Sequence, residues 1–91
     1  MATSLQVGDI IQIPDNEIGE SVVDEVFDME TAERMKRTHP VGVRCDRMIA
    51  RDPGDNLIVF LDGAYHYWDH ETDRIIWLGS SPEEFAMADD V

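Results

Sequence analysis

The clearest pattern in the chain is a series of short apolar runs in its second half, separated by residues typical of turns. The runs cover residues 57–61, 64–68 and 74–78. The Asp-Gly pair at 62–63 separates the first two runs, and such a pair between apolar segments is typical of a two-residue β-hairpin. The three runs therefore predict an antiparallel three-stranded meander over residues 57–78.

The residues on either side of this meander predict one more strand and a short helix. Upstream, the apolar residues from Val41 to Ile49 indicate a strand, and residues 52–56 (Asp-Pro-Gly-Asp-Asn) are a strong turn signal. Downstream, the sequence Ser-Pro-Glu-Glu at 81–84 supplies an N-cap, a proline at the first helical position and a capping-box glutamate. We therefore expect a short C-terminal helix over residues 81–88.

The first half of the chain predicts a short strand over residues 9–13 and the main helix over residues 21–37. In the helix, apolar residues follow helical spacing, and Ser21 with Asp24 resembles a capping box. The Val-Val and Val-Phe pairs leave a second division open. In that division residues 21–27 form a strand, and Asp28 caps a shorter helix over residues 28–37.

Together these elements predict a single α+β domain over residues 1–91. Its small antiparallel sheet, the meander over 57–78, would pack with the helix near 21–37 and the short helix over 81–88. A small β-barrel with one inserted helix stays open as an alternative, because Val7 to Ile11 resembles the opening strand of such a barrel.

Charge changes this picture more than any other bulk property. The chain of 91 residues has 20 acidic and 7 basic residues, for a formal net charge of −13. Residues 34–51 carry six of the seven bases, and acids dominate on both sides. Such a field repels nucleic acid and anionic membranes and attracts basic proteins. We expect a basic protein partner, with no direct contact to nucleic acid or membrane; acidity that serves solubility alone is the simpler alternative.

Catalytic and metal-binding signatures are weak. Asp69-x-Glu71-x-Asp73 resembles the start of a calcium loop, but Arg74 stands where that loop needs glycine. No glycine-rich phosphate loop is present, and no local signature surrounds Cys45, the one cysteine. We therefore expect no enzyme activity, no metal and no cofactor. The single cysteine and the absence of a secretion signal favour the cytoplasm.

The aromatic residues of the meander are candidates for a binding surface. In the run 64–68, Tyr65 and Tyr67 point to one face of the strand, while His66 and Trp68 point to the other. An exposed tyrosine near carboxylates is a typical interface hot spot. The alternative is that both faces are covered and all of these rings belong to the core.

Residues 52–88 resemble the C-terminal half of the SUKH superfamily. The resemblance is carried by Tyr67-Trp-Asp-His-Glu71, followed by a Ser-Pro-Glu-Glu-Phe segment that ends at Phe85. The resemblance implies an α+β fold. It also implies a function, since many bacterial members are immunity proteins that bind and neutralise toxins, often nucleases.

From charge and resemblance together we expect an immunity-type protein that neutralises a basic toxin effector, such as a nuclease, by occluding its active site. Two alternatives remain, namely a phage-type inhibitor that mimics nucleic acid and an acidic accessory or regulatory domain. The expected partner-binding residues are the acids near the start of the helix, the two tyrosines and the acids of the following turn: Glu20, Asp24, Glu25, Asp28, Tyr65, Tyr67, Asp69, Glu71 and Asp73.

Overall fold

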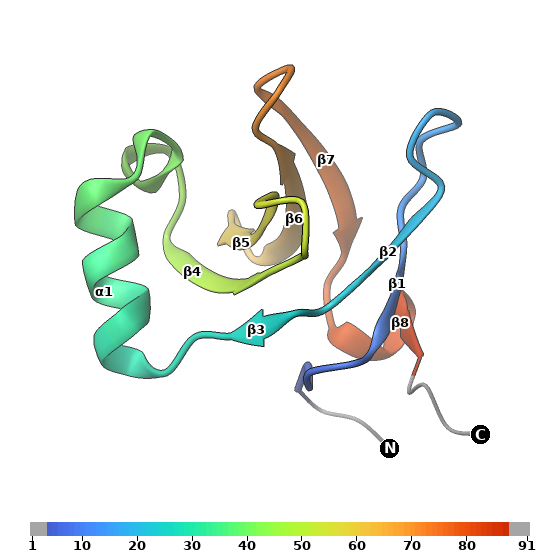
Figure 1. The fold of residues 1–91 in the computed structure, drawn as a ribbon, viewed down its shortest axis with the longest axis horizontal. Helices are drawn as coiled ribbons and strands as arrows, with labels where there is room; N and C mark the ends of the chain where they lie inside the picture. The colour runs from blue at the N-terminus through green and yellow to red at the C-terminus, as the bar shows by residue number, and fades with distance from the viewer. Residues whose placement is uncertain (1–3, 88–91) are drawn as a thin grey trace.

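The fold consists of two antiparallel sheets and one α-helix (Figure 1). The computed structural model describes residues 4–87. The first sheet has the order β2 (Glu20–Val22), β1 (Ile10–Gln12), β8 (Ala86–Met87), and the second has the order β3 (Glu25–Val26), β4 (Arg47–Arg51), β5 (Leu57–Leu61), β6 (Ala64–Asp69), β7 (Arg74–Gly79). The helix α1 spans Met29–Thr38, and the 3₁₀ helices are η1 (Pro40–Arg44) and η2 (Pro82–Glu84). Within the described residues, no helix is long and apolar enough to cross a membrane.

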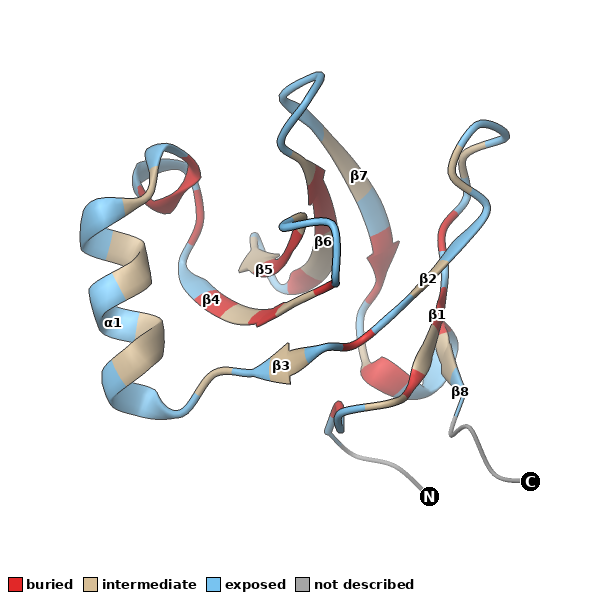
Figure 2. Ribbon diagram, in the orientation of Figure 1, coloured by how far each residue is buried: buried red, intermediate tan, exposed pale blue. Residues whose placement is uncertain are grey.

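The central strands of the five-stranded sheet are buried on both faces, which gives the molecule two hydrophobic cores. Figure 2 shows the buried residues of β4, β5 and β6. One core joins this sheet to the three-stranded sheet and includes Ile11, Val23 and Ile58. The other joins it to α1 and η1 and includes Val41 and Val59. Because neighbouring β5 residues serve opposite cores, the apolar run over 57–61 shows no polar alternation.

The predicted meander over residues 57–78 is confirmed as β5, β6 and β7. Its first turn pairs Leu61 with Ala64, and Asp62 and Gly63 both have positive φ angles, 51° and 79°. Two consecutive residues with positive φ are what a type I′ hairpin requires, and glycine adopts such angles without steric cost. The α+β class is therefore confirmed. The two sheets stay open across residues 4–87, with β3 and β7 at the edges of the larger one, so these residues form no closed barrel.

The helix predicted over residues 21–37 is wrong in its first third. This segment forms β2 and β3, and the alternative with a strand before a shorter helix is the correct one. Val23 is 1% exposed, and its backbone pairs with Gly8 and Asp9, so tertiary burial of β-branched residues outweighs the helical spacing. Asp28 caps α1 by accepting a hydrogen bond from the Thr31 N–H at 2.7 Å, whereas Ser21 takes no part in capping.

Two further boundaries differ from the prediction. The helix expected over residues 81–88 is one 3₁₀ turn, followed by β8, and residue 88 lies outside the described part. The Ser81–Glu84 capping box is present, but the Phe85 carbonyl then accepts the Gln12 N–H at 2.7 Å, so the chain continues the first sheet. The strand expected over 41–49 begins only at Arg47, because residues 40–44 form η1.

The Asp28 cap supports a first prediction. Replacing Asp28 with alanine should lower the free energy of unfolding by about 1 kcal/mol, because Thr31 loses its acceptor at the helix start. Asp28→Asn should keep nearly full stability, since asparagine caps as well as aspartate. Urea denaturation of both variants measures the effect, and equal losses in the two would show that the charge matters rather than the cap.

Candidate acidic binding surface

Strands β2 and β3 follow one another in the chain, and each is an edge strand of its own sheet. The segment from residue 20 to residue 28 therefore runs along the outer edge of both sheets before it enters α1 (Figure 1). It carries four of the acids predicted to bind a partner, and we call them the acidic edge: Glu20, Asp24, Glu25 and Asp28. Because the segment is extended, these acids are spread along the edge of the sheets instead of sharing one helical face.

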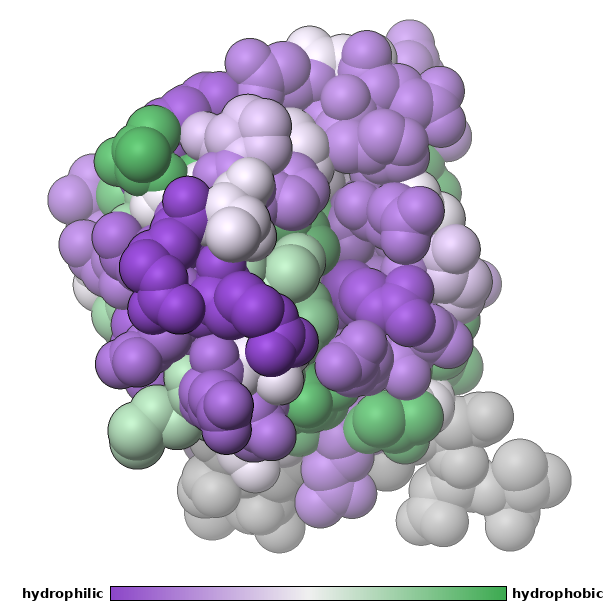
Figure 3. Space-filling model, turned by 60° about the vertical axis from the view of Figure 1, so that its left-hand side comes forward, coloured by the Kyte–Doolittle hydropathy of each residue, from purple (hydrophilic) through white to green (hydrophobic). Residues whose placement is uncertain are grey.

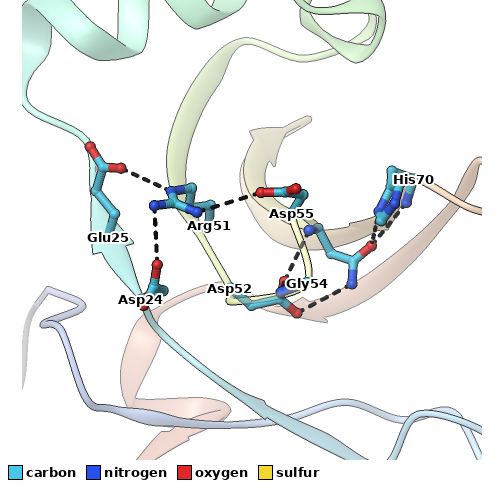
Figure 4. Close-up of polar contacts among 8 residues, drawn as sticks. Asp24, Glu25, Arg51, Asp52, Gly54, Asp55 and His70 are labelled. Carbon is cyan, nitrogen blue, oxygen red and sulfur yellow. Dashed lines mark hydrogen bonds and ion pairs between the residues drawn. The ribbon is translucent and has the colours of Figure 1, made fainter.

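Arg51 on β4 organises the centre of the acidic edge (Figure 4). Its guanidinium lies 2.9 Å from Glu25, 3.1 Å from Asp24 and 3.5 Å from Asp55. Hydrogen bonding to Glu25 raises the pKa of Arg51 above its ordinary value, as do the nearby charges of Asp24, Glu25 and Asp55. Three carboxylates therefore share one base, and the cluster keeps an excess of negative charge. The carboxylates are accessible, since the side chains of Asp24, Glu25 and Asp55 are 43%, 45% and 80% exposed.

The turn between β4 and β5 is fixed by Asp52, whose side chain is buried. Its carboxylate accepts hydrogen bonds from the Tyr67 hydroxyl at 2.6 Å and the Ser21 hydroxyl at 2.8 Å. It also accepts the backbone N–H groups of Gly54 and Asn56, each at 2.9 Å. Burial opposes ionisation, but the hydrogen bonds from Tyr67, Ser21 and Asn56 outweigh it and lower the pKa of Asp52. A rigid turn thus holds Asp55 beside Arg51.

The same turn joins the acidic edge to the second predicted group of acids. The Oδ1 atom of Asn56 accepts the backbone N–H of His70 at 3.0 Å and lies 2.7 Å from its Nδ1. His70 belongs to the turn between β6 and β7, which also carries Glu71 and Asp73 and directly follows Asp69, the last residue of β6. In Figure 4 Arg51 contacts Glu25 and Asp55, while Asn56, the residue after Asp55 in the chain, makes the contacts with His70. The β4–β5 turn therefore contacts both Arg51, at the centre of the acidic edge, and the β6–β7 turn.

The three acids of the β6–β7 turn are not equally free to meet a partner. Asp73 forms an ion pair with Arg44 at 2.7 Å and accepts the Trp68 indole N–H at 2.8 Å. Both contacts lower the pKa of the Asp73 carboxyl, the indole contact most. Asp69 accepts the Glu71 N–H at 3.0 Å. The Glu71 side chain makes no hydrogen bond or ion pair within residues 4–87 and is exposed, so it is the acid of this turn most available for binding.

Of the two predicted tyrosines, only Tyr65 reaches the surface. Tyr67 is 2% exposed, and both burial and its hydrogen bond to Asp52 raise the pKa of the hydroxyl. Its place in the binding set is therefore wrong: the three-stranded sheet covers this face of β6 and turns Tyr67 into a core residue. Tyr65 is half-buried against Phe85. Trp77 on the edge strand β7 is 54% exposed, and the sequence pattern did not distinguish it from a core ring.

Cys45 is a core residue, and His39 is half-buried. The Cys45 thiol is 6% exposed, and burial raises its pKa, so the thiol stays protonated at neutral pH. His39 packs edge-on against Trp68 with ring centroids 4.9 Å apart, and burial lowers its pKa. Among residues 4–87 no group of three or more His, Cys, Asp and Glu side chains is arranged to hold a metal ion.

Comparison with protein-family models, with curated proteins and with solved structures found no match to this chain.

Proposed function

We propose that this protein binds and inhibits a basic protein through the acidic edge and the neighbouring turns. The observation that carries the proposal is the alignment of Glu20, Asp24, Glu25 and Asp28 along the common edge of the two sheets. Asp55 joins them through Arg51, which is the one base in the cluster. A formal net charge of −13 adds a long-range attraction to basic surfaces.

The geometry suits recognition of Lys and Arg side chains. Carboxylates that are fixed before binding lose less conformational entropy when a partner arrives, so more of the interaction energy appears as affinity. Glu25 and Asp24 are fixed by Arg51, and Asp55 by the buried carboxylate of Asp52 through the turn. An incoming guanidinium would pair with the outward oxygens of these carboxylates while Arg51 stays in place.

The partner class that we propose is a toxin effector with a basic active site, such as a nuclease. The resemblance of residues 52–88 to SUKH immunity proteins supports this choice. A surface that binds nucleic acid is basic, so a rigid acidic edge placed over it would exclude the substrate. Inhibition by occlusion needs no chemistry from the inhibitor, which fits a chain whose one thiol is buried in the core.

Charge reversal of the edge tests the proposal. Asp24→Lys with Glu25→Lys should slow association with the basic partner by on the order of 10-fold or more at low salt, and should flatten the salt dependence. Asp62→Lys with Glu83→Lys changes the net charge equally at exposed sites away from the edge and serves as the control. Stopped-flow or surface-binding kinetics over a salt series measures both.

The partner for that test is obtained by retaining proteins from a nuclease-treated lysate on the wild-type chain. A basic protein that is retained by the wild type and the control, lost by the edge variant, and inhibited on binding would support the proposal. If the partner bound the edge variant and the wild type alike, the edge would not be the binding surface. Displacement by added DNA or RNA would show that the protein occupies a nucleic-acid groove.

A further inference from the structure

A groove of about 590 Å³ lies between α1 and the first half of β4, next to the acidic edge. Its walls are mainly apolar and come from four parts of the fold, with Phe27, Met29 and Ala32 on one side and Met48 and Tyr65 among the residues opposite. Figure 3, in which the α1 side of the molecule comes forward, shows apolar surface exposed between hydrophilic side chains. The groove also contains the one predicted tyrosine that reaches the surface.

The groove exists because β3 is too short to cover β4. The two residues of β3 pair only with Ala50 and Arg51, so β4 has no strand partner on this side over Arg47 and Met48. Helix α1 crosses beyond this point and has no buried residue of its own. Met29 at its start is 80% exposed, an unusual exposure for a long apolar side chain at the mouth of an apolar groove.

Charge at the Met29 end of the groove, next to the acidic edge, favours a basic partner there. The wall from Val26 to Glu33 carries Asp28, Glu30 and Glu33 and no base, and it continues directly from the acidic edge. The two bases that line the groove, Lys36 and Arg47, lie beyond this wall, and the Arg47 guanidinium stacks over the Phe60 ring at 4.8 Å. An apolar side chain that enters at Met29 would therefore have acids beside it on the edge side.

We propose that this groove takes one long apolar side chain, of the leucine, methionine or phenylalanine class, from the basic partner, while neighbouring Lys or Arg residues of that partner pair with the acidic edge. The inference rests on the proposed function and adds to it the anchor that an electrostatic surface lacks. Burial of such a side chain should raise the affinity by roughly 10- to 100-fold. An apolar anchor in a pocket with a charged rim is the usual composition of an interface hot spot.

A peptide series tests the anchor without knowledge of the partner. The probes are short peptides of alternating Lys and Ser in which one central position is Gly, Ala, Leu, Met or Phe. On the wild-type chain, affinity measured by fluorescence anisotropy should rise by about 10-fold or more from Gly to Leu or Phe. Amide chemical shifts should change at Phe27, Met29 and Met48 with the apolar peptides, and only at the acidic edge with the Gly peptide.

Three variants identify the surface responsible. Met29→Ser removes an exposed wall of the groove, and Ala32→Trp fills it, so each should abolish the rise across the series while leaving salt-dependent binding of the Gly peptide unchanged. Val43→Ser alters a side chain that is 85% exposed and does not line the groove, and it should retain the rise. Met29 lies on the surface, so Met29→Ser keeps the test valid if Ala32→Trp fails to fold.

The outcomes separate the groove from the acidic edge. A flat series with salt-dependent binding of every peptide would overturn the groove and leave the proposed function standing. Suppose that in the double variant Asp24→Lys with Glu25→Lys the affinity still rises from the Gly peptide to the Leu and Phe peptides and is independent of salt. That result would support the groove and overturn the acidic-edge function. Binding of none of the peptides at low salt would overturn both.

Discussion

Replacing Asp52 with alanine is expected to lower the free energy of unfolding by about 3–5 kcal/mol, although only a small carboxylate group is removed. The Asp52 carboxylate is 4% exposed and is the acceptor for the Tyr67 and Ser21 hydroxyls and for two backbone N–H groups of the turn. Without it, the Tyr67 hydroxyl is a buried donor with no acceptor, and each such group costs about 1–3 kcal/mol. Urea denaturation at neutral pH gives the value.

Two milder variants show how much of this loss of stability comes from each contact of Asp52. Tyr67→Phe removes the hydroxyl donor and its hydrogen bond to Asp52, but leaves no buried donor without an acceptor. It should lower the free energy of unfolding by about 1–2 kcal/mol. Asp52→Asn keeps an acceptor oxygen but loses the charge. Its loss of unfolding free energy should therefore lie between those of Tyr67→Phe and Asp52→Ala. If Asp52→Ala cost no more than Tyr67→Phe, the turn would be held by its own backbone rather than by this carboxylate.

The Asp52 network also sets a pH dependence with a defined sign. The folded-state pKa of Asp52 is below its ordinary value, so its contribution to stability is fully present above the unfolded-state pKa, near 4. That contribution is lost as the pH falls through the folded-state pKa. The wild type should therefore lose stability more steeply in acid than Asp52→Asn does. Parallel acid slopes for the two proteins would contradict the hydrogen-bonded carboxylate as the source.

The parts of the fold that the sequence predicts well are those with local signals. The meander depends on the Asp-Gly turn and on apolar runs of strand length, and both are properties of adjacent residues. The capping role of Ser81 is likewise local and correct. In contrast, residues 21–27 carry apolar residues at helical spacing. They form strands instead of a helix because Val23 is buried between the two sheets. That burial depends on partners far away in the chain, which a local pattern does not contain.

The candidate site shows the same division. Glu20, Asp24 and Glu25 were predicted as binding residues because of charge, and they do form a common surface, though along a strand edge instead of a helix start. Asp55 and Arg51 were missed, since their roles follow from the pairing of Glu25 with Arg51 across β3 and β4. Tyr67 was misplaced because alternation defines two faces of a strand but not what covers each of them. The Asp52 turn signal was visible, but its buried carboxylate was not.

Replacing Gly42 with alanine is the second change with a large expected effect, of about 3 kcal/mol or more. Gly42 lies in η1, directly under the last turn of α1. A Cβ there would overlap the Lys36 carbonyl oxygen and would lie 2.6 Å from the Lys36 carbonyl carbon and 2.8 Å from its Cα. These are backbone atoms, so no rotamer change relieves the overlap, and α1 would have to move away from the sheet.

Gly54→Ala is the matched control for this overlap. A Cβ at Gly54 would meet only the Asn56 side-chain amide, at 3.3 Å, and the Asp52 carboxylate, at 3.5 Å. Its cost should stay below about 1 kcal/mol, because the Asn56 amide needs only a slight shift to relieve a contact of 3.3 Å, whereas a helix backbone cannot give way so easily. Similar losses in the two variants would mean that glycine flexibility, and not the α1–η1 contact, explains the effect at Gly42. Because α1 forms one wall of the groove, Gly42→Ala should also weaken the preference for Leu and Phe in the peptide series, and the salt dependence set by the acidic edge should persist.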